Sequence, residues 1–209
     1  MKTQTTFYDF DQHTPEWEAI RIGKVGGSEA VGLSTAARMK TLIPKKLAEI
    51  LTKETQDKGF VSEDMQHGID TEPLARSEFE KRNLVEVTQF GYITNDKYKY
   101  LGLSPDGLIG GMDSDPKKGI EIKCPLPKTH IEAIISGNIP TVYKPQIAQM
   151  FMVVETIEEV TFISYNEKVT QKPYYEITVT REEFVDEILK IQKGYFDFEK
   201  KIGEYLKLF

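Results

Sequence analysis

The sequence predicts an α/β fold in which one central β-sheet is flanked by helices. Helix-like segments, with apolar residues three and four positions apart, occupy both ends of the chain. Short strand-like runs separated by Gly, Asn and Asp fill residues 85–124, and two more runs follow between helical segments. This interleaving of helices and strands is typical of a layered α/β domain.

Length and composition limit the class of protein. The 209 residues fit one domain, since single cores split only beyond roughly 250 residues, and we expect a single domain over residues 1–209. With 39% hydrophobic and 29% charged residues, the chain is neither disordered nor membrane-spanning. The single cysteine, Cys124, cannot form an internal disulfide or a Cys-rich metal site, which favours a reducing cytoplasm.

The net charge of −6 argues against a general nucleic-acid coat, which would need a broadly basic surface. It does not exclude an enzyme that acts on DNA. Such an enzyme can gather carboxylates at a metal site and line one channel with basic residues.

The first helices are predicted from end signals. Thr14 followed by Pro15 indicates the start of a helix that Gly23 ends. Ser28 is expected to cap the next short helix. A glycine-containing turn separates the two predicted helices.

Two longer helices are expected next. Residues 44–54 (PKKLAEILTKE) place Leu47, Ile50 and Leu51 on one face behind an N-terminal proline, as in an amphipathic helix. Residues 63–82 predict a longer helix, which its internal proline should bend or restart near residue 71 because one backbone hydrogen bond is lost.

The remaining elements follow from changes in hydrophobic period. The expected strands are residues 85–90, 92–95, 97–104, 106–110, 119–124, 160–166 and 174–180. Residues 129–136, closed by Gly137, and residues 142–155 predict helices. Thr180 and Glu183 form a capping box for a C-terminal helix that runs nearly to the last residue.

One strand carries an unusual pair of charges. Because side chains alternate along a strand, Glu121 and Lys123 point to one face, while the apolar residues around them face the core. Asp106 begins a strand that we expect to pair with residues 119–123. That pairing would bring the Asp106 carboxylate beside Glu121.

Two interpretations of this group are open. An isolated E-x-K pair is more often a surface ion pair, which contributes little to stability. Two carboxylates about 4 Å apart, however, repel by roughly 4 kcal/mol at an effective dielectric near 20, and one lysine cannot neutralise them together with a third acid. A divalent cation can, and Mg²⁺ favours carboxylate, carbonyl and water oxygens.

The residues also resemble a known pattern. Pro105-Asp106 followed by Glu121-Ile122-Lys123 looks like the PD-(D/E)xK nuclease signature. Three further blocks resemble the phage-type alkaline exonucleases, the lambda exonuclease or YqaJ-like viral recombinase family. They are Trp17 to Glu29 (W-x3-R-x-G-x4-SE), Gly68 to Arg76, and Tyr143 to Ile147. The resemblance implies a restriction-endonuclease-like core, with a central mixed β-sheet flanked by helices.

The resemblance assigns catalytic and metal-binding roles. One or two Mg²⁺ ions, with Mn²⁺ able to substitute, would be bound by Glu72, Asp106, Glu121 and the Ile122 carbonyl. Lys123 would orient or deprotonate the attacking water and stabilise the pentacovalent phosphate. Gln146 would position that lysine or the water.

A second implied site holds the 5′-phosphate of a DNA end. Arg21, Ser28 and Ser104 match the family's positions, and a guanidinium and hydroxyl groups suit a phosphate chemically. Residues 146–148 read Gln-Ile-Ala where lambda exonuclease has Gln-Val-Gln, which leaves the second glutamine's role unassigned.

The implied function is a Mg²⁺-dependent, ATP-independent 5′→3′ exonuclease that acts on double-stranded DNA ends and leaves 3′ single strands for recombination by strand annealing. No GxxxxGK[ST] motif occurs, so no coupled motor is expected within the chain. The family further implies a homotrimer, a single-strand annealing protein as partner, no membrane, and the cytoplasm of a bacterial or phage-infected cell.

Two other functions remain open. The same metal site would serve a restriction-like or structure-specific endonuclease, which would nick a covalently closed plasmid that an exonuclease leaves intact. The third possibility is a catalytically silent DNA-end binding module. A binder has no reason to keep Asp106, Glu121 and Lys123 together, which argues against it.

Overall fold

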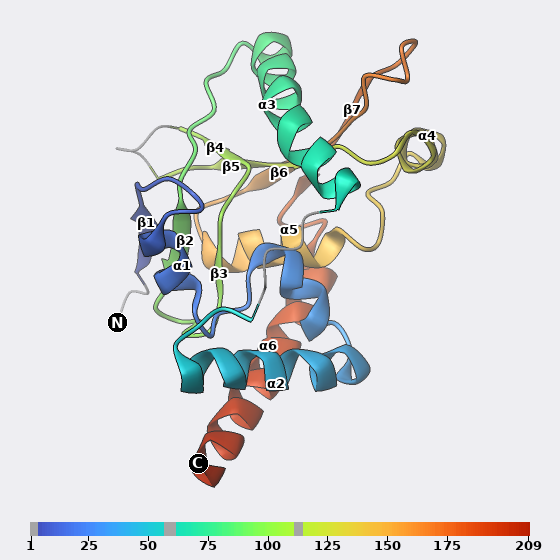
Figure 1. Ribbon diagram of the computed structural model, residues 1–209. Helices are drawn as coiled ribbons and strands as arrows, with labels where there is room; N and C mark the ends of the chain where they lie inside the picture. Colours follow the sequence, from blue (N-terminus) through green and yellow to red (C-terminus); the bar gives the residue numbers. More distant parts are fainter. Residues whose placement is uncertain (1–3, 57–61, 111–114) are drawn as a thin grey trace.

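The computed structural model describes residues 4–56, 62–110 and 115–209. It confirms the α/β class with a mixed sheet between helices, but the strands form two sheets rather than one (Figure 1). The antiparallel sheet has the order β1-β2-β3, with bounds β1 (Thr5–Tyr8), β2 (Tyr92–Asn95) and β3 (Gly102–Leu103). The mixed sheet has the order β4-β5-β6-β7, with bounds β4 (Gly107–Ile109), β5 (Lys118–Lys123), β6 (Glu159–Tyr165) and β7 (Tyr174–Thr180). Within it, β5 and β6 are parallel and the other neighbours antiparallel.

Two expected strands are shorter than predicted. Residues 85–90 contribute only an isolated bridge between Thr88 and Leu108, because the neighbouring β4 is itself short. Within residues 97–104 only β3 is extended, since turns at residues 96–100 reverse the chain. Strand β1 was not expected from the sequence at all.

The helices alternate with these strands along the chain. Their bounds are α1 (Pro15–Arg21), η1 (Gly27–Leu33), α2 (Ala36–Thr52), α3 (Glu63–Asn83), α4 (Pro127–Ser136), α5 (Lys144–Val153), α6 (Val185–Tyr205) and η2 (Leu206–Leu208). The Thr14 side chain accepts a hydrogen bond from the Trp17 backbone N–H, which confirms the predicted cap of α1. Gly23 then adopts a φ of +71° and turns the chain away from the helix.

The expected cap of η1 was wrong. Gly26 occupies the N-cap, and the Glu29 carboxylate accepts a hydrogen bond from its backbone N–H at 3.0 Å. Ser28 therefore lies inside η1, with its side chain exposed. The start of η1 is thus held by the bond between the Gly26 backbone and the Glu29 side chain, and not by the serine hydroxyl that the sequence suggested.

The bounds of α2 also differ from the expectation. The helix begins at Ala36, capped by the Thr35 side chain, and passes through the exposed Pro44 rather than starting there. Leu51 is exposed, and the buried face consists of Met39, Leu42, Ile43, Lys46 and Glu49. Helix α3 likewise continues through its proline as one helix and does not restart near residue 71.

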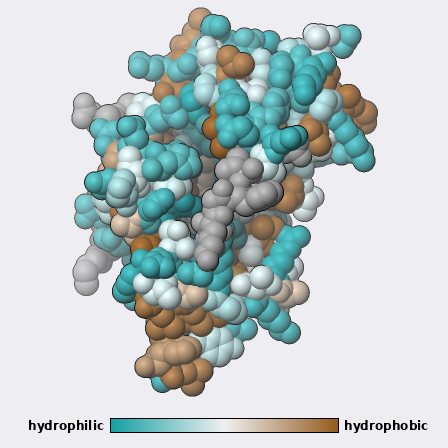
Figure 2. Space-filling model, in the orientation of Figure 1, coloured by the Kyte–Doolittle hydropathy of each residue, from teal (hydrophilic) through white to brown (hydrophobic). Residues whose placement is uncertain are grey.

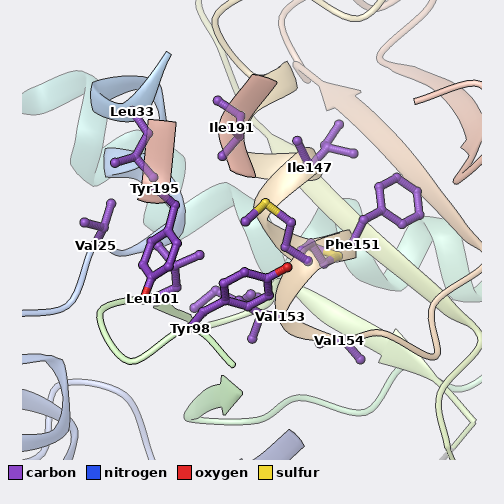
Figure 3. Packing of buried hydrophobic residues seen from close by; sticks show 14 of the residues in the cluster. Val25, Leu33, Tyr98, Leu101, Ile147, Phe151, Val153, Val154, Ile191 and Tyr195 are labelled. Carbon is purple, nitrogen blue, oxygen red and sulfur yellow. The ribbon is translucent and has the colours of Figure 1, made fainter. Parts of the chain in front are cut away.

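The mixed sheet separates two apolar clusters. Helix α5 lies on one side, and Figure 3 shows its Ile147 and Phe151 in the larger cluster with Ile191 and Tyr195 of α6. Helix α3 lies on the other side, where the smaller cluster contains Ala75, Phe79, Ile120, Ile122 and Ile163. Figure 1 shows α3 above and α5 below the sheet. Strand β5 therefore has one face toward each helix.

The surface is mixed in polarity (Figure 2). Hydrophobic residues gather at the lower end of that view, where the chain ends in Figure 1, and Leu208 and Phe209 are largely exposed there. Within the described residues, no helix combines the length and the apolar character needed to span a bilayer.

Candidate active site

The end of β4 places Asp106 against β5. The register pairs Gly107 with Ile120. Beyond this pair the Asp106 side chain, and not the β4 backbone, bonds to β5. Its Oδ2 atom accepts a hydrogen bond from the Ile122 backbone N–H at 2.6 Å. Because the N–H and C=O of a strand residue point to the same neighbour, the Ile122 carbonyl faces the same side as Asp106.

Glu121 and Lys123 project together from the opposite face to Ile120 and Ile122, as the alternation predicts. Lys123 Nζ lies 2.5 Å from Glu121 Oε1, and the Glu121 side chain is only 1% exposed. The lysine ammonium lies 5.6 Å from the ring centroid of Tyr143, just before α5. The pair is thus enclosed between the sheet and the start of α5, which is not the setting of a surface ion pair.

Arg76 joins the third acid to this group. Glu72 and Arg76 lie one turn apart on α3, and the Arg76 guanidinium forms an ion pair with the Glu72 carboxylate. The same guanidinium donates through Nε to the backbone carbonyl of Asp106 at 3.0 Å. Helix α3 therefore fixes both Glu72 and the turn that carries Asp106.

The three carboxylates crowd one another electrostatically. Burial raises the pKa of Glu72, and the negative charge of Asp106 raises it further. Burial raises the pKa of Glu121 to about 8, with the attraction of Lys123 opposing this shift and Asp106 adding to it. Burial disfavours the charge on Lys123, but Glu121 and Asp106 outweigh it and raise the lysine pKa. When all three carboxylates are ionised, Lys123 and Arg76 together leave one negative charge unbalanced.

This donor set fits a hard divalent cation. Such an ion prefers carboxylate and carbonyl oxygens, which Glu72, Asp106, Glu121 and Ile122 supply. It would offset the burial and the mutual repulsion that together raise the pKa values of Glu72 and Glu121. Over the described ranges of the chain, no three acidic, His or Cys side chains already converge as metal ligands. Glu72 instead contacts Arg76, and Glu121 contacts Lys123.

Gln146 and Ser28 meet beside the lysine. They line a pocket of about 260 Å³ together with Lys123, Tyr143 and Gly27. A Cβ at Gly27 would lie 3.3 Å from the Gln146 side chain, so a side chain there would press against the glutamine. The structure thus places Gln146 and Ser28 on the Lys123 side of the site.

A larger pocket opens on the α3 side. Its volume is about 420 Å³, and Glu72, Ile122, Lys123 and Tyr143 are among the residues that line it. Exposed Met65 forms part of its wall. Lys123 lines both pockets, so this side chain can be approached from two directions.

Arg21 and Ser104 are linked through Trp17. The Arg21 guanidinium carbon lies 3.8 Å from the Trp17 ring centroid, and the indole Nε1–H donates to Ser104 Oγ at 2.9 Å. The Ser104 hydroxyl donates in turn to the Gly91 carbonyl at 2.6 Å. Ser104 is therefore held in place next to Asp106, but its proton already has an acceptor.

Comparison with known proteins identifies the family of the chain. The model of the YqaJ-like viral recombinase domain matches residues 16–158, which include every candidate site residue. The chain belongs to this family. A search of the curated proteins found no match.

Solved structures resemble the YqaJ-like chain over most of its length, including the part that the family model does not match. The alkaline exonuclease LHK-Exo from Laribacter hongkongensis is 30% identical, with a TM-score of 0.77, and the match covers 93% of this chain and 96% of that one. The same protein in complex with dAMP gives a TM-score of 0.78 at the same identity and coverage. A phage-related exonuclease from Haemophilus somnus 129PT, 12% identical over 88% of this chain and 96% of its own, has a TM-score of 0.55 and shares the fold.

Three residues of the YqaJ-like site were missed from the sequence. Trp17 and Arg76 were noted only as parts of sequence blocks, although each donates a hydrogen bond inside the site. Gln149 was not considered. Its buried Nε2 donates to the carbonyls of Val25 and Gly102, both at 2.9 Å, and so joins the segments that lead to Ser28 and Ser104. A second glutamine one helical turn after Gln146 was the available signal.

Proposed function

We propose that this chain is a Mg²⁺-dependent, ATP-independent 5′→3′ exonuclease that resects double-stranded DNA ends. The observation that carries the proposal is the enclosed group of Asp106, Glu121 and Lys123 at the end of β5, beside Glu72 on α3. The likeness to LHK-Exo, an alkaline exonuclease, supports the same reaction class.

Each residue of the site would have its own role in the hydrolysis. A bound Mg²⁺ ion, or Mn²⁺ in its place, would supply an activated water and neutralise charge on the scissile phosphate. Glu72, Asp106, Glu121 and the Ile122 carbonyl would hold it. Lys123 would orient the water and stabilise the pentacovalent phosphate, and Gln146, which shares its pocket, would position the lysine or the water.

End recognition would depend on Arg21, Ser28 and Ser104. Over the described residues no carboxylate forms a salt bridge with Arg21, so its guanidinium can pair with a terminal phosphate. Ser28 is exposed in the pocket that also contains Lys123. The Ser104 hydroxyl would exchange its Gly91 acceptor for phosphate, or would act by fixing Trp17 beneath Arg21.

The products and partners complete the proposal. Removal of the 5′ strand would leave a 3′ single strand, which a single-strand annealing protein would take up for recombination. The chain would assemble as a homotrimer around the DNA. These partners are supported by family membership.

The decisive experiment uses linear duplexes labelled at the 5′ or the 3′ end, incubated with Mg²⁺, Mn²⁺ or EDTA, beside a covalently closed plasmid. We expect early release of the 5′ label with either metal, none in EDTA, and an intact plasmid. Nicking of the plasmid would instead identify an endonuclease. End binding without nucleotide release in every condition would identify a silent binding module.

A further inference from the structure

A buried ion network lies beneath the turn that connects α1 to η1. Its centre is Lys46 on α2, which is 3% exposed although its side chain is charged. Lys46 Nζ lies 2.8 Å from Glu29 Oε2, and 3.1 and 3.0 Å from the two carboxylate oxygens of Glu49. One ammonium group thus joins a carboxylate of η1 to a carboxylate of α2.

Each carboxylate also holds one end of the turn. Glu49 Oε2 accepts from the Gly23 backbone N–H, and Glu29 Oε2 accepts from the Gly26 backbone N–H, both at 3.0 Å. A Cβ at Gly23 would lie 2.6 Å from Ile50, so the turn passes close against α2. Lys46 therefore connects both fixed points of the turn.

The turn connects two of the proposed phosphate contacts, which lie on the elements at its two ends. Arg21 lies two residues before Gly23, and Ser28 lies two residues after Gly26. Gln149 fixes the carbonyl of Val25 inside the same turn. A shift of the turn would move the guanidinium and the hydroxyl relative to the metal site.

A buried ion network is by itself weak evidence for a contribution to stability. Replacing a buried ion pair by well-packed apolar groups is often neutral or stabilising, because burying charges costs several kcal/mol per ion. Burial disfavours the charge on Glu29, but Lys46 and Lys45 hold the pKa of its carboxyl below the usual value. What the network provides is a fixed geometry of the turn.

We propose that Lys46 is a positioning residue for recognition of the terminal phosphate. By bridging Glu29 and Glu49 it holds the turn of residues 23–26, so that Arg21 and Ser28 at its two ends meet a 5′-phosphate in one arrangement. This inference rests on the proposed exonuclease function and deepens it. It assigns end preference to a side chain that contacts no DNA.

The test compares initial rates on matched duplexes with 5′-phosphate or 5′-hydroxyl ends. The variants are Lys46→Met, Arg21→Ala, and Lys40→Met as the matched control from an exposed position on the same helix. We expect Lys46→Met to lose roughly ten- to a hundredfold in kcat/KM on phosphorylated ends, mostly through KM, and much less on hydroxyl ends. Lys40→Met should keep the wild-type ratio between the two ends.

A double variant separates positioning from stability. Lys46→Met leaves Glu49 without its ammonium partner, whereas Lys46→Met with Glu49→Gln removes that buried charge and keeps an acceptor for the Gly23 N–H. We expect the double variant to recover the melting temperature but not the end preference. Recovery of both together, or full preference in Lys46→Met, would overturn the inference.

Arg21→Ala distinguishes failure of this inference from failure of the proposed phosphate site. If Arg21→Ala lowers the ratio of the rate on 5′-phosphate ends to the rate on 5′-hydroxyl ends and Lys46→Met does not, only the positioning role of Lys46 is wrong. If wild type shows no preference, or Arg21→Ala weakens both substrates equally, the phosphate site itself is wrong and the role of Lys46 is overturned with it.

Discussion

Replacing Asp106 in two ways separates its structural bond from its charge. One carboxylate oxygen accepts the Ile122 N–H at 2.6 Å, while the negative charge of the group raises the pKa values of Glu72 and Glu121. Asp106→Asn keeps an acceptor for that N–H and removes the charge. Asp106→Ala removes both, and neither variant should cleave DNA because an anionic metal ligand is lost.

The two variants should differ from each other in stability. In EDTA, the asparagine variant should unfold with a free energy equal to or above that of wild type, because carboxylate repulsion is relieved. The alanine variant gains the same relief but leaves a partly buried N–H unsatisfied. It should therefore be about 1–2 kcal/mol less stable than the asparagine variant, or roughly 2–8 °C lower in melting temperature for a chain of this size.

Thermal melts followed by circular dichroism measure these differences, first in EDTA and then over a Mg²⁺ series. Mg²⁺ should raise the melting temperature of wild type progressively, and should do so far less in both variants. A clear loss of stability in the asparagine variant in EDTA would refute the crowded-carboxylate reasoning. Equal stabilisation of all three proteins by Mg²⁺ would refute the role of Asp106 as a ligand.

Three further predictions concern other parts of the molecule. Lys123→Ala should abolish cleavage while DNA-end binding persists. Replacing Lys118, an exposed lysine on the same strand, by Ala should leave the cleavage rate normal. Cleavage by the Lys123 variant would show that Lys123 has no part in the mechanism. Arg181→Met should lower the melting temperature markedly in a thermal scan, because the guanidinium donates to four backbone carbonyls around the end of α5; an unchanged melt would show that water replaces it. Analytical ultracentrifugation should give about three times the chain mass of 23.9 kDa, and a monomer at micromolar concentration would reject the trimer.

Local signals in the sequence predicted the parts of the fold that depend on neighbouring residues. Gly137 ends α4 with a φ of +63° as expected. Thr180 and Glu183 form their reciprocal bonds, but these lie in the turn before α6, whose N-cap is Phe184 and not Thr180 as expected. Pairing between distant segments was not predictable in this way. Strand β1 pairs with β2, about 90 residues later, and nothing within residues 5–8 identifies that partner.

The same division holds for the candidate site. The alternation of Glu121 and Lys123 and the pairing of β4 with β5 followed from strand geometry, and the resemblance added Glu72 and Gln146. The bridging contacts of Arg76 and the acceptor of the Ser104 proton did not follow, because they depend on which distant backbone carbonyl lies within reach. Resemblance to a family can therefore suggest which residues form a site, whereas their hydrogen-bond partners can be identified only in the folded structure.

The bond between Asp106 and Ile122 also makes one backbone amide a reporter of the site. The Ile122 proton points at a carboxylate whose other oxygen accepts no hydrogen bond among the described residues, so a cation bound to that carboxylate would alter the shielding of the proton directly. In an ¹⁵N-labelled sample the Ile122 resonance should therefore follow metal loading with no DNA present. Ion occupancy could then be measured separately from turnover, at a single atom of the main chain.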